Sequence, residues 1–216
     1  NGKVTAIVGA SGSGKTTLVK LLLGFYEPLN GSIEIGNTNL NEYNLGWWRS
    51  QCGAVMQEGY LFSDTIARNI AISDDEPDIE RIRHAARVAN IADYIETLPL
   101  AYNTMIGQDG QGISQGQRQR ILIARVVYKN PMFVFLDEAT NALDANNERA
   151  ITENLSDFYK GKTVIVVAHR LSTVRDADQI VVLDDGKIVE VGTHEELTSK
   201  RGKYFALVKN QLELGN

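Results

Sequence analysis

A glycine-rich loop between a short apolar run and a helical segment constrains this chain more than any other feature. Residues 9–16 read GASGSGKT, which fits the pattern G-x-x-x-x-G-K-[ST] at every fixed position. Residues 3–8 (KVTAIV) predict a buried strand, and residues 17–23 predict a helix. A strand, a glycine-rich turn and a helix in this order predict a phosphate-binding loop in an α/β fold.

Each fixed position of the loop has a physical task. Glycines let the backbone curl so that successive N–H groups point at phosphates, and the helix N-terminus adds partial positive charge. Lys15 places a point charge on the β and γ phosphates, and Thr16 offers a hydroxyl to Mg²⁺. We expect a magnesium–nucleoside triphosphate to bind to Gly9, Ser11, Gly12, Ser13, Gly14, Lys15, Thr16 and Thr17.

Short apolar runs alternate with helical segments along the rest of the chain. This alternation predicts an α/β fold with a mainly parallel sheet. A Thr-x-x-Glu capping box at Thr193 and Glu196 predicts a C-terminal helix. Further strands are predicted at residues 32–35, 53–57, 132–136, 163–168 and 179–183, and a helix at 146–159.

Residues between 59 and 125 show a different sequence pattern. Segments 64–71, 77–90 and 91–98 have helical spacing, with no strand expected between them. We therefore predict one domain over residues 1–216, with a core of about 1–58 and 126–216 and an inserted helical subdomain of about 59–125.

Two acids, Asp137 and Glu138, follow the predicted strand at 132–136. An acid at the carboxyl end of a core strand lies where open α/β sheets bind ligands. Asp137 would hold Mg²⁺ through water, completing the site with Thr16. Glu138 is then the better candidate to polarise the attacking water, because the metal already occupies its neighbour.

Gln57 and His169 also end predicted strands. An amide at position 57 can reach metal and water together, and His169 can donate a hydrogen bond to the γ-phosphate. Taken alone, either residue is more often structural.

A second polar turn, residues 113–117 (ISQGQ), leads into the helical segment 121–128. Ser114 and Gln117 stand at capping-box spacing, so this turn is another helix N-terminus that can bind an anion. One γ-phosphate does not need two such helices from one chain. The simplest explanation for two such anion sites in one chain is that a second chain takes part in nucleotide binding.

The order of these motifs resembles that of the nucleotide-binding domains of ABC transporters, over essentially the whole chain. Residues 9–16 resemble the Walker A loop, Gln57 the Q-loop glutamine, and 113–117 the LSGGQ signature. Residues 133–138 resemble Walker B with its catalytic glutamate, 141–144 the D-loop, and His169 the switch histidine. The resemblance implies a P-loop NTPase (RecA-like) core with an inserted helical subdomain and peripheral antiparallel strands.

In that family two domains pair head-to-tail around two ATP molecules. The resemblance implies an ATPase in which Ser114, Gly116 and Gln117 act in trans on the partner's ATP, and in which Asp144 belongs to the D-loop. It implies catalytic roles for Glu138, His169 and Gln57, and Mg²⁺ ligands at Thr16, Gln57 and Asp137. A two-fold arrangement uses one surface twice, which explains both anion sites, and competent Glu138 and His169 favour a homodimer.

Finer features resemble exporters. Residues 104–110 (TMIGQDG) resemble the exporter stretch TxVGExG, and residues 57–70 and 192–197 resemble exporter segments. They imply a motor domain fused to a membrane domain in a bacterial exporter of lipids, drugs or peptides, at the cytoplasmic face of the inner membrane. Because no apolar run here approaches the roughly 20 residues that span a bilayer, we expect this piece itself to be soluble.

The chain departs from the family pattern at four points. Gln115 replaces the first signature glycine, Asn141 the usual D-loop serine, and Gln108 the usual acid before the signature. The aromatic residue on which the family stacks adenine would precede Asn1. We therefore expect an N-terminally truncated piece with weakened nucleotide affinity and some exposed sheet edge.

Two other functions are weighed against a transport motor. A soluble ABC-type ATPase acting on nucleic acid or ribosomes usually carries two cassettes, coiled-coil insertions or basic patches. This chain has a net charge of −5 and no block rich in Lys or Arg, so nucleic acid is not expected as a partner. A metabolic P-loop kinase would leave residues 113–117 without a task. The single cysteine, Cys52, rules out an internal disulfide.

Overall fold

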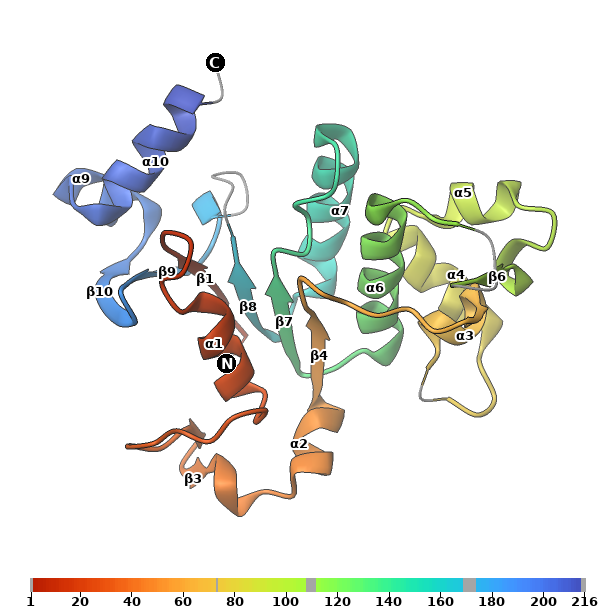
Figure 1. The fold of residues 1–216 in the computed structure, drawn as a ribbon, viewed down its shortest axis with the longest axis horizontal. Helices are drawn as coiled ribbons and strands as arrows, with labels where there is room; N and C mark the ends of the chain where they lie inside the picture. The colour runs from red at the N-terminus through yellow and green to blue at the C-terminus, as the bar shows by residue number, and fades with distance from the viewer. Residues whose placement is uncertain (1, 73, 108–111, 169–173, 215–216) are drawn as a thin grey trace. The chain divides into compact units, whose positions relative to one another are not determined.

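The structure is a computed structural model that describes residues 2–72, 74–107, 112–168 and 174–214 of the chain. It divides into two compact units (Figure 1). The first comprises Asn1–Gly53, Met132–Glu138 and Gly161–Asn216, and the second comprises Ala54–Pro131 and Ala139–Lys160. The predicted helical insertion, 59–125, lies within the second unit, which also contains residues 139–160.

A six-stranded sheet organises the first unit. Its order is β10-β9-β1-β8-β7-β4, and the chain passes into the second unit within β4. β1 pairs in parallel with both β8 and β9, β7 pairs in parallel with β8, and β10 runs antiparallel to β9. The predicted α/β fold with mainly parallel strands is confirmed. The strands are β1 (Val4–Val8), β4 (Cys52–Val55), β7 (Phe133–Asp137), β8 (Thr163–Val167), β9 (Gln179–Asp184) and β10 (Lys187–Gly192).

The central strands are buried because their side chains are apolar on both faces. Ala6, Val164 and Ile180 are fully buried, as expected for parallel strands covered on two sides. Trp48 closes one end of this core: its ring contacts Phe133 at a centroid distance of 4.8 Å, and its indole N–H donates to the carbonyl of Leu22. The rigid packing of this core fixes the carboxyl ends of β1 and β7.

Short helices and strands complete the first unit. α1 follows β1 and packs on β7, and α9 begins at a capping box of Thr193 and Glu196, which confirms the predicted helix start. The remaining elements are α1 (Lys15–Leu22), α2 (Leu45–Gln51), α9 (His194–Lys200), α10 (Lys203–Leu214), the 3-10 turn η1 (Leu40–Glu42), and the antiparallel pair β2 (Glu34–Ile35) and β3 (Thr38–Asn39).

The second unit is built around α6, which packs against α3 and α4. Its apolar side chains Ile121 and Ile123 are almost fully buried. The elements are α3 (Ile66–Ile70), α4 (Ile79–Val88), α5 (Ala92–Thr97), η2 (Ala101–Asn103), α6 (Gln115–Lys129), α7 (Ala145–Phe158), β5 (Asp64–Thr65) and β6 (Met105–Ile106).

The helical prediction for residues 64–71 is wrong at its first two residues, which form β5, and no sequence signal indicated β6. β5 and β6 form an antiparallel pair of two residues each, which joins segments about forty positions apart in the sequence. Neither strand is long enough to show an alternating pattern, so periodicity could not reveal them. In the described part of the chain, no helix combines the length and the apolarity that crossing a bilayer requires.

Candidate functional site

The glycine-rich loop leaves β1 where there is no room for a side chain. A Cβ atom at Gly9 would lie 2.2 Å from the carbonyl oxygen of Leu183 on β9. Gly12 and Gly14 have positive φ angles, 79° and 98°, that side chains rarely adopt. Gly14 is the N-cap of α1 and brings no side-chain cap, and this fully described helix has no acidic residue in its first turn. The N–H groups of the first turn have no carbonyl of a preceding helical turn to pair with, and they therefore suit an anion.

Lys15 lies folded back over the same loop. Its ammonium donates to the carbonyls of Gly9, at 3.0 Å, and Ala10, at 2.8 Å, and only 6% of the residue is exposed. Burial lowers the pKa of Lys15, while the negative charges of Glu138 and Asp137 act in the opposite direction. A buried cation is thereby held beside the loop, within the electrostatic reach of two acids.

Those two acids end β7, the strand on which α1 packs. Asp137 is the last residue of the strand and is fully buried. Glu138 follows with a φ of 54°, a left-handed conformation unusual for a residue with a side chain, and its N–H donates to the carbonyl of Val167. Such strained residues cluster at functional sites.

The residues of the first unit fit a phosphate and a divalent cation. The Ser13 hydroxyl is buried and has no hydrogen-bond partner among the residues that the structure describes, so a donor remains available in the loop. The hydroxyl of Thr16 and the carboxylate of Asp137 are the hard oxygen ligands that Mg²⁺ prefers. The loop, Lys15 and the two acids belong to one unit.

The second polar turn lies in the other unit, at the start of α6. Ser114 is the N-cap: its Oγ accepts the N–H of Gln117 at 3.2 Å, and the Gln117 side chain accepts the N–H of Ser114 at 2.8 Å. The predicted capping box is confirmed. The Ser114 hydroxyl oxygen acts as an acceptor in this box, and its proton can still be donated to an anion.

Asp144 caps α7 in the same unit. Its carboxylate accepts the backbone N–H groups of Asn146 and Asn147 and the side-chain amide of Asn147. These hydrogen bonds, above all the ones from Asn147, lower the pKa of Asp144, so the carboxylate stays ionised.

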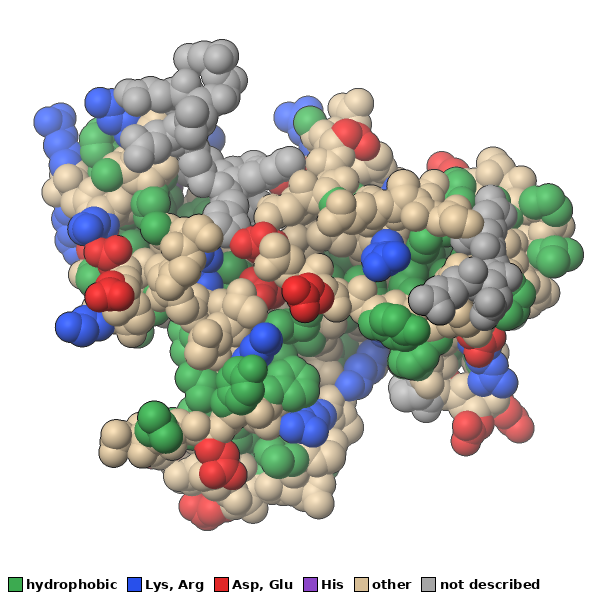
Figure 2. All heavy atoms as spheres, viewed as in Figure 1, with side chains coloured by type: hydrophobic (Ala, Val, Ile, Leu, Met, Phe, Trp, Pro, Cys, Tyr) green, Lys and Arg blue, Asp and Glu red, His purple; other side chains and the backbone are tan. Residues whose placement is uncertain are grey.

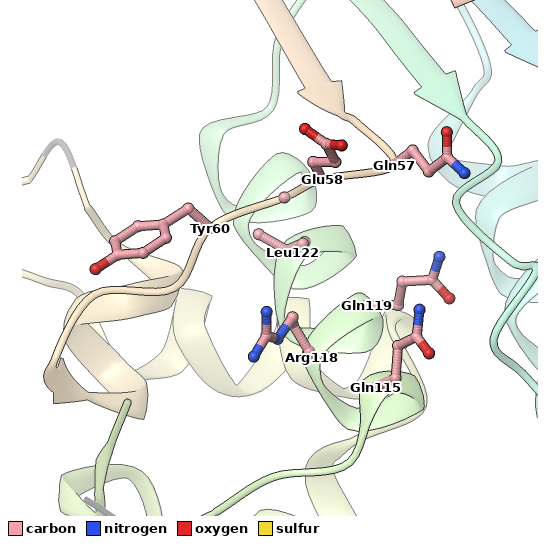
Figure 3. A pocket seen from close by; sticks show the side chains of 8 residues that line it. Gln57, Glu58, Tyr60, Gln115, Arg118, Gln119 and Leu122 are labelled. Carbon is pink, nitrogen blue, oxygen red and sulfur yellow. The ribbon is translucent and has the colours of Figure 1, made fainter. Parts of the chain in front are cut away.

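Gln57 lines a cavity of about 490 Å³ within the second unit. Figure 3 shows the amides of Gln115 and Gln119 side by side on consecutive turns of α6, with Gln57 on the segment that follows β4. The sequence did not single out Gln119 or Arg118, although their spacing from Gln115 places them on neighbouring turns of one helix. The full lining is Gln57, Glu58, Gly59, Tyr60, Gln115, Arg118, Gln119 and Leu122.

The predicted site residues thus fall into two groups. The phosphate loop, Asp137 and Glu138 lie in the first unit, whereas Gln57, Asp144 and the signature turn (Ser114, Gly116 and Gln117) lie in the second. His169 and Gln108 lie outside the described residues. A glycine loop between β1 and α1, with acids at the end of β7, which β8 separates from β1 in the same mainly parallel sheet, defines the class of P-loop nucleotide-binding domains.

Comparison with known proteins identifies the family. The family model described as "ABC transporter" matches residues 1–141, so the chain belongs to the ABC transporter family, as its ATP-binding domain. An ATP-dependent lipid A-core flippase of Alkalilimnicola ehrlichii is 48% identical over 211 residues, which are 97% of this chain and 36% of that protein. The exotoxin translocation ATP-binding protein PaxB of Pasteurella aerogenes is 48% identical over 98% of this chain and 30% of its own length.

Similar sequences also occur in plants, and a solved structure has the same fold. ABC transporter B family member 14 of Arabidopsis thaliana is 46% identical over 98% of this chain and 17% of its own length. A bacterial Atm1-family ABC exporter with ATP bound matches with a TM-score of 0.94 and 40% identity, covering 98% of this chain and 37% of that one. The chain therefore spans little more than a third, or less, of the relatives described here.

Proposed function

We propose that this chain is the ATP-binding and ATP-hydrolysing motor domain of an ABC exporter. The observation that carries the proposal is the buried Lys15, which lies on a side-chain-free phosphate loop within the electrostatic reach of Asp137 and Glu138. The names of the flippase and the toxin-translocation relatives support export as the process that this motor drives.

The predicted site residues have distinct tasks in hydrolysis. The loop N–H groups and Lys15 would bind the phosphates of ATP, and Thr16, Asp137 and Gln57 would hold Mg²⁺. The metal neutralises charge on the phosphates when it is bound. Glu138 would hold and polarise the attacking water, and His169 would donate a hydrogen bond to the γ-phosphate.

The second unit would act on the ATP of another chain. Ser114, Gly116 and Gln117 would close over the partner's γ-phosphate, so that two copies pair head-to-tail and each ATP is bound by both. ATP binding would join the copies and hydrolysis would separate them. Such a cycle does work only because the joined and separated states differ in nucleotide affinity.

A membrane domain, fused in the full-length protein, would sense this cycle through the second unit. The cavity beside Gln57 is the proposed receiving surface, because Tyr60, which lines it, is 65% exposed. Phe62, whose ring contacts that of Tyr60, is 47% exposed. Figure 2 also shows apolar side chains on the surface in the region of α1. In the segment that follows α1 in sequence, Phe25, Tyr26 and Leu29 are more than half exposed. Such surfaces commonly mark protein interfaces. The domain would therefore lie at the cytoplasmic face of the inner membrane.

ATP hydrolysis by the full-length protein in lipid vesicles tests this proposal. We expect magnesium-dependent hydrolysis that is lost in Lys15→Ala and Glu138→Gln and that nucleic acid leaves unchanged. Stimulation by RNA or DNA would favour the alternative of a soluble ATPase acting on nucleic acid. Transfer of phosphate to a small molecule instead of water would favour a kinase.

A further inference from the structure

The start of α6 packs directly against the loop that precedes α7. A Cβ atom at Gly116 would lie 3.1 Å from the carbonyl oxygen of Ala142 and 3.5 Å from Leu143. The backbone of the signature turn is therefore in contact with the loop that ends at Asp144. This loop, the Asp144 loop, comprises residues 141–144 and begins three residues after Glu138 in the sequence.

A buried amide fastens the loop one turn further along α6. The side-chain oxygen of Gln119 accepts the N–H of Ala142 at 3.1 Å, and only 8% of Gln119 is exposed. A hydrogen bond in such a place resists the separation of helix and loop, because opening it would leave buried polar groups without partners.

A second connection runs from Arg120 through one amide to Asp144. Arg120 donates from Nη1 to the carbonyl of Asn90, at 2.6 Å, and to the side-chain oxygen of Asn147, at 3.2 Å. Asn147 donates from its side-chain nitrogen to the Asp144 carboxylate at 2.5 Å. Asn90 adds a donor to the same Asn147 oxygen at 3.0 Å. The amide of Asn147 is thus fixed in one orientation between a cation and an anion.

The charges agree with this geometry. Burial lowers the pKa of Arg120, and the charge of Asp144 acts in the opposite direction. The guanidinium stays protonated in any case, so the connection persists across the physiological pH range.

We propose that Gln119, Arg120 and Asn147 are positioning residues that make the signature turn and the Asp144 loop one mechanical element. This inference rests on the proposed function. When the signature turn closes on the ATP of the partner chain, the connection moves the loop that follows this chain's own Glu138. Binding at one ATP site thereby alters the other.

Asn147→Ala tests the connection with little other change. Arg120 keeps the Asn90 carbonyl and Asp144 keeps two backbone N–H groups, so neither charge loses all its partners. In the full-length protein we expect the Hill coefficient of ATP hydrolysis to fall toward 1. We also expect the half-saturating ATP concentration to rise about three- to ten-fold, the size of one lost hydrogen bond.

Two further variants separate coupling from folding. Asn146→Ala is the matched control, since this neighbouring asparagine side chain is exposed and only its backbone N–H caps α7. Asn90→Gly removes one donor to Asn147 at a residue whose φ of 51° glycine adopts without strain, so it should lower the Hill coefficient even if Asn147→Ala folds poorly. Unchanged cooperativity in either correctly folded variant, with a cooperative parent, overturns the positioning role. A parent that does not hydrolyse ATP refutes the proposed function itself.

Discussion

Replacing Gly9 with alanine tests whether the phosphate loop is shaped by steric exclusion. The new Cβ would lie 2.2 Å from the Leu183 carbonyl oxygen and 2.6 Å from the Ser13 hydroxyl, whereas ordinary contact begins near 3.4 Å. Ser13 can rotate away, but Leu183 is backbone of β9, paired with Ile188 of β10. The two atoms must therefore separate by about 1.2 Å, which distorts either the sheet or the loop.

We expect the cost of this overpacking to reach about 3 kcal/mol, the upper end for an enlarged side chain in a packed site. For a chain of this size that corresponds to a fall in Tm of roughly 6–12 °C, measured by scanning calorimetry. ATP affinity should fall as well, because the displaced loop no longer aims its N–H groups at the phosphates.

Gly12→Ala is the matched control within the same loop. Its Cβ would meet nothing within 4 Å, so only the positive φ of 79° opposes the change. That penalty is about 1 kcal/mol, or roughly 2–4 °C in Tm. The steric reasoning is refuted if Gly9→Ala melts with the parent, or if Gly12→Ala is the less stable of the two.

Three further changes act in the second unit. Ser114→Ala removes the cap of α6, and calorimetry should show a loss of about 1 kcal/mol, whereas no loss would contradict the capping box. Asn69→Ala should lower the free energy of unfolding in urea by about 2–4 kcal/mol, because this buried amide donates to three carbonyls and accepts the N–H of Phe62. A loss below about 1 kcal/mol would contradict this expectation. Folding lowers the pKa of Asp144, so its ionised carboxylate stabilises the folded protein at pH values above the unfolded-state pKa of about 4. This stabilisation is lost as the pH falls through the pKa of the folded state. An NMR titration should show that Asn147→Ala raises this pKa, and an unchanged pKa would contradict the hydrogen-bond account.

The sequence predicted the elements whose signals are local. The phosphate loop and the capping boxes at Ser114 and Thr193 were readable because each rests on residues within one helical turn. The parallel strands were readable because they are short, continuous apolar runs between helices. These same features carry most of the candidate site.

The features that the sequence could not predict depend on residues far apart in the chain or lie in segments with only a weak preference for helix or strand. α2 was missed because it is only seven residues long, although Asn44, whose side chain accepts the N–H of Trp47, was a usable start signal. β10 was missed because its alternating residues are largely exposed and it is defined by pairing with β9. The contacts of Arg120 with Asn90 and Asn147 join three segments and have no local signature.

Glu138→Gln in the full-length protein tests the central claim most directly. A label on helix α7, introduced by Arg149→Cys at an exposed position, would report the distance between the two copies by pulsed electron paramagnetic resonance. Lys15→Ala serves as the control that cannot bind the phosphates. With ATP and Mg²⁺ we expect Glu138→Gln to lose hydrolysis and to hold the two domains in a closed pair that Lys15→Ala does not form. Hydrolysis at the parent rate, or an open pair at saturating ATP, would contradict the account of a motor driven by ATP-dependent pairing.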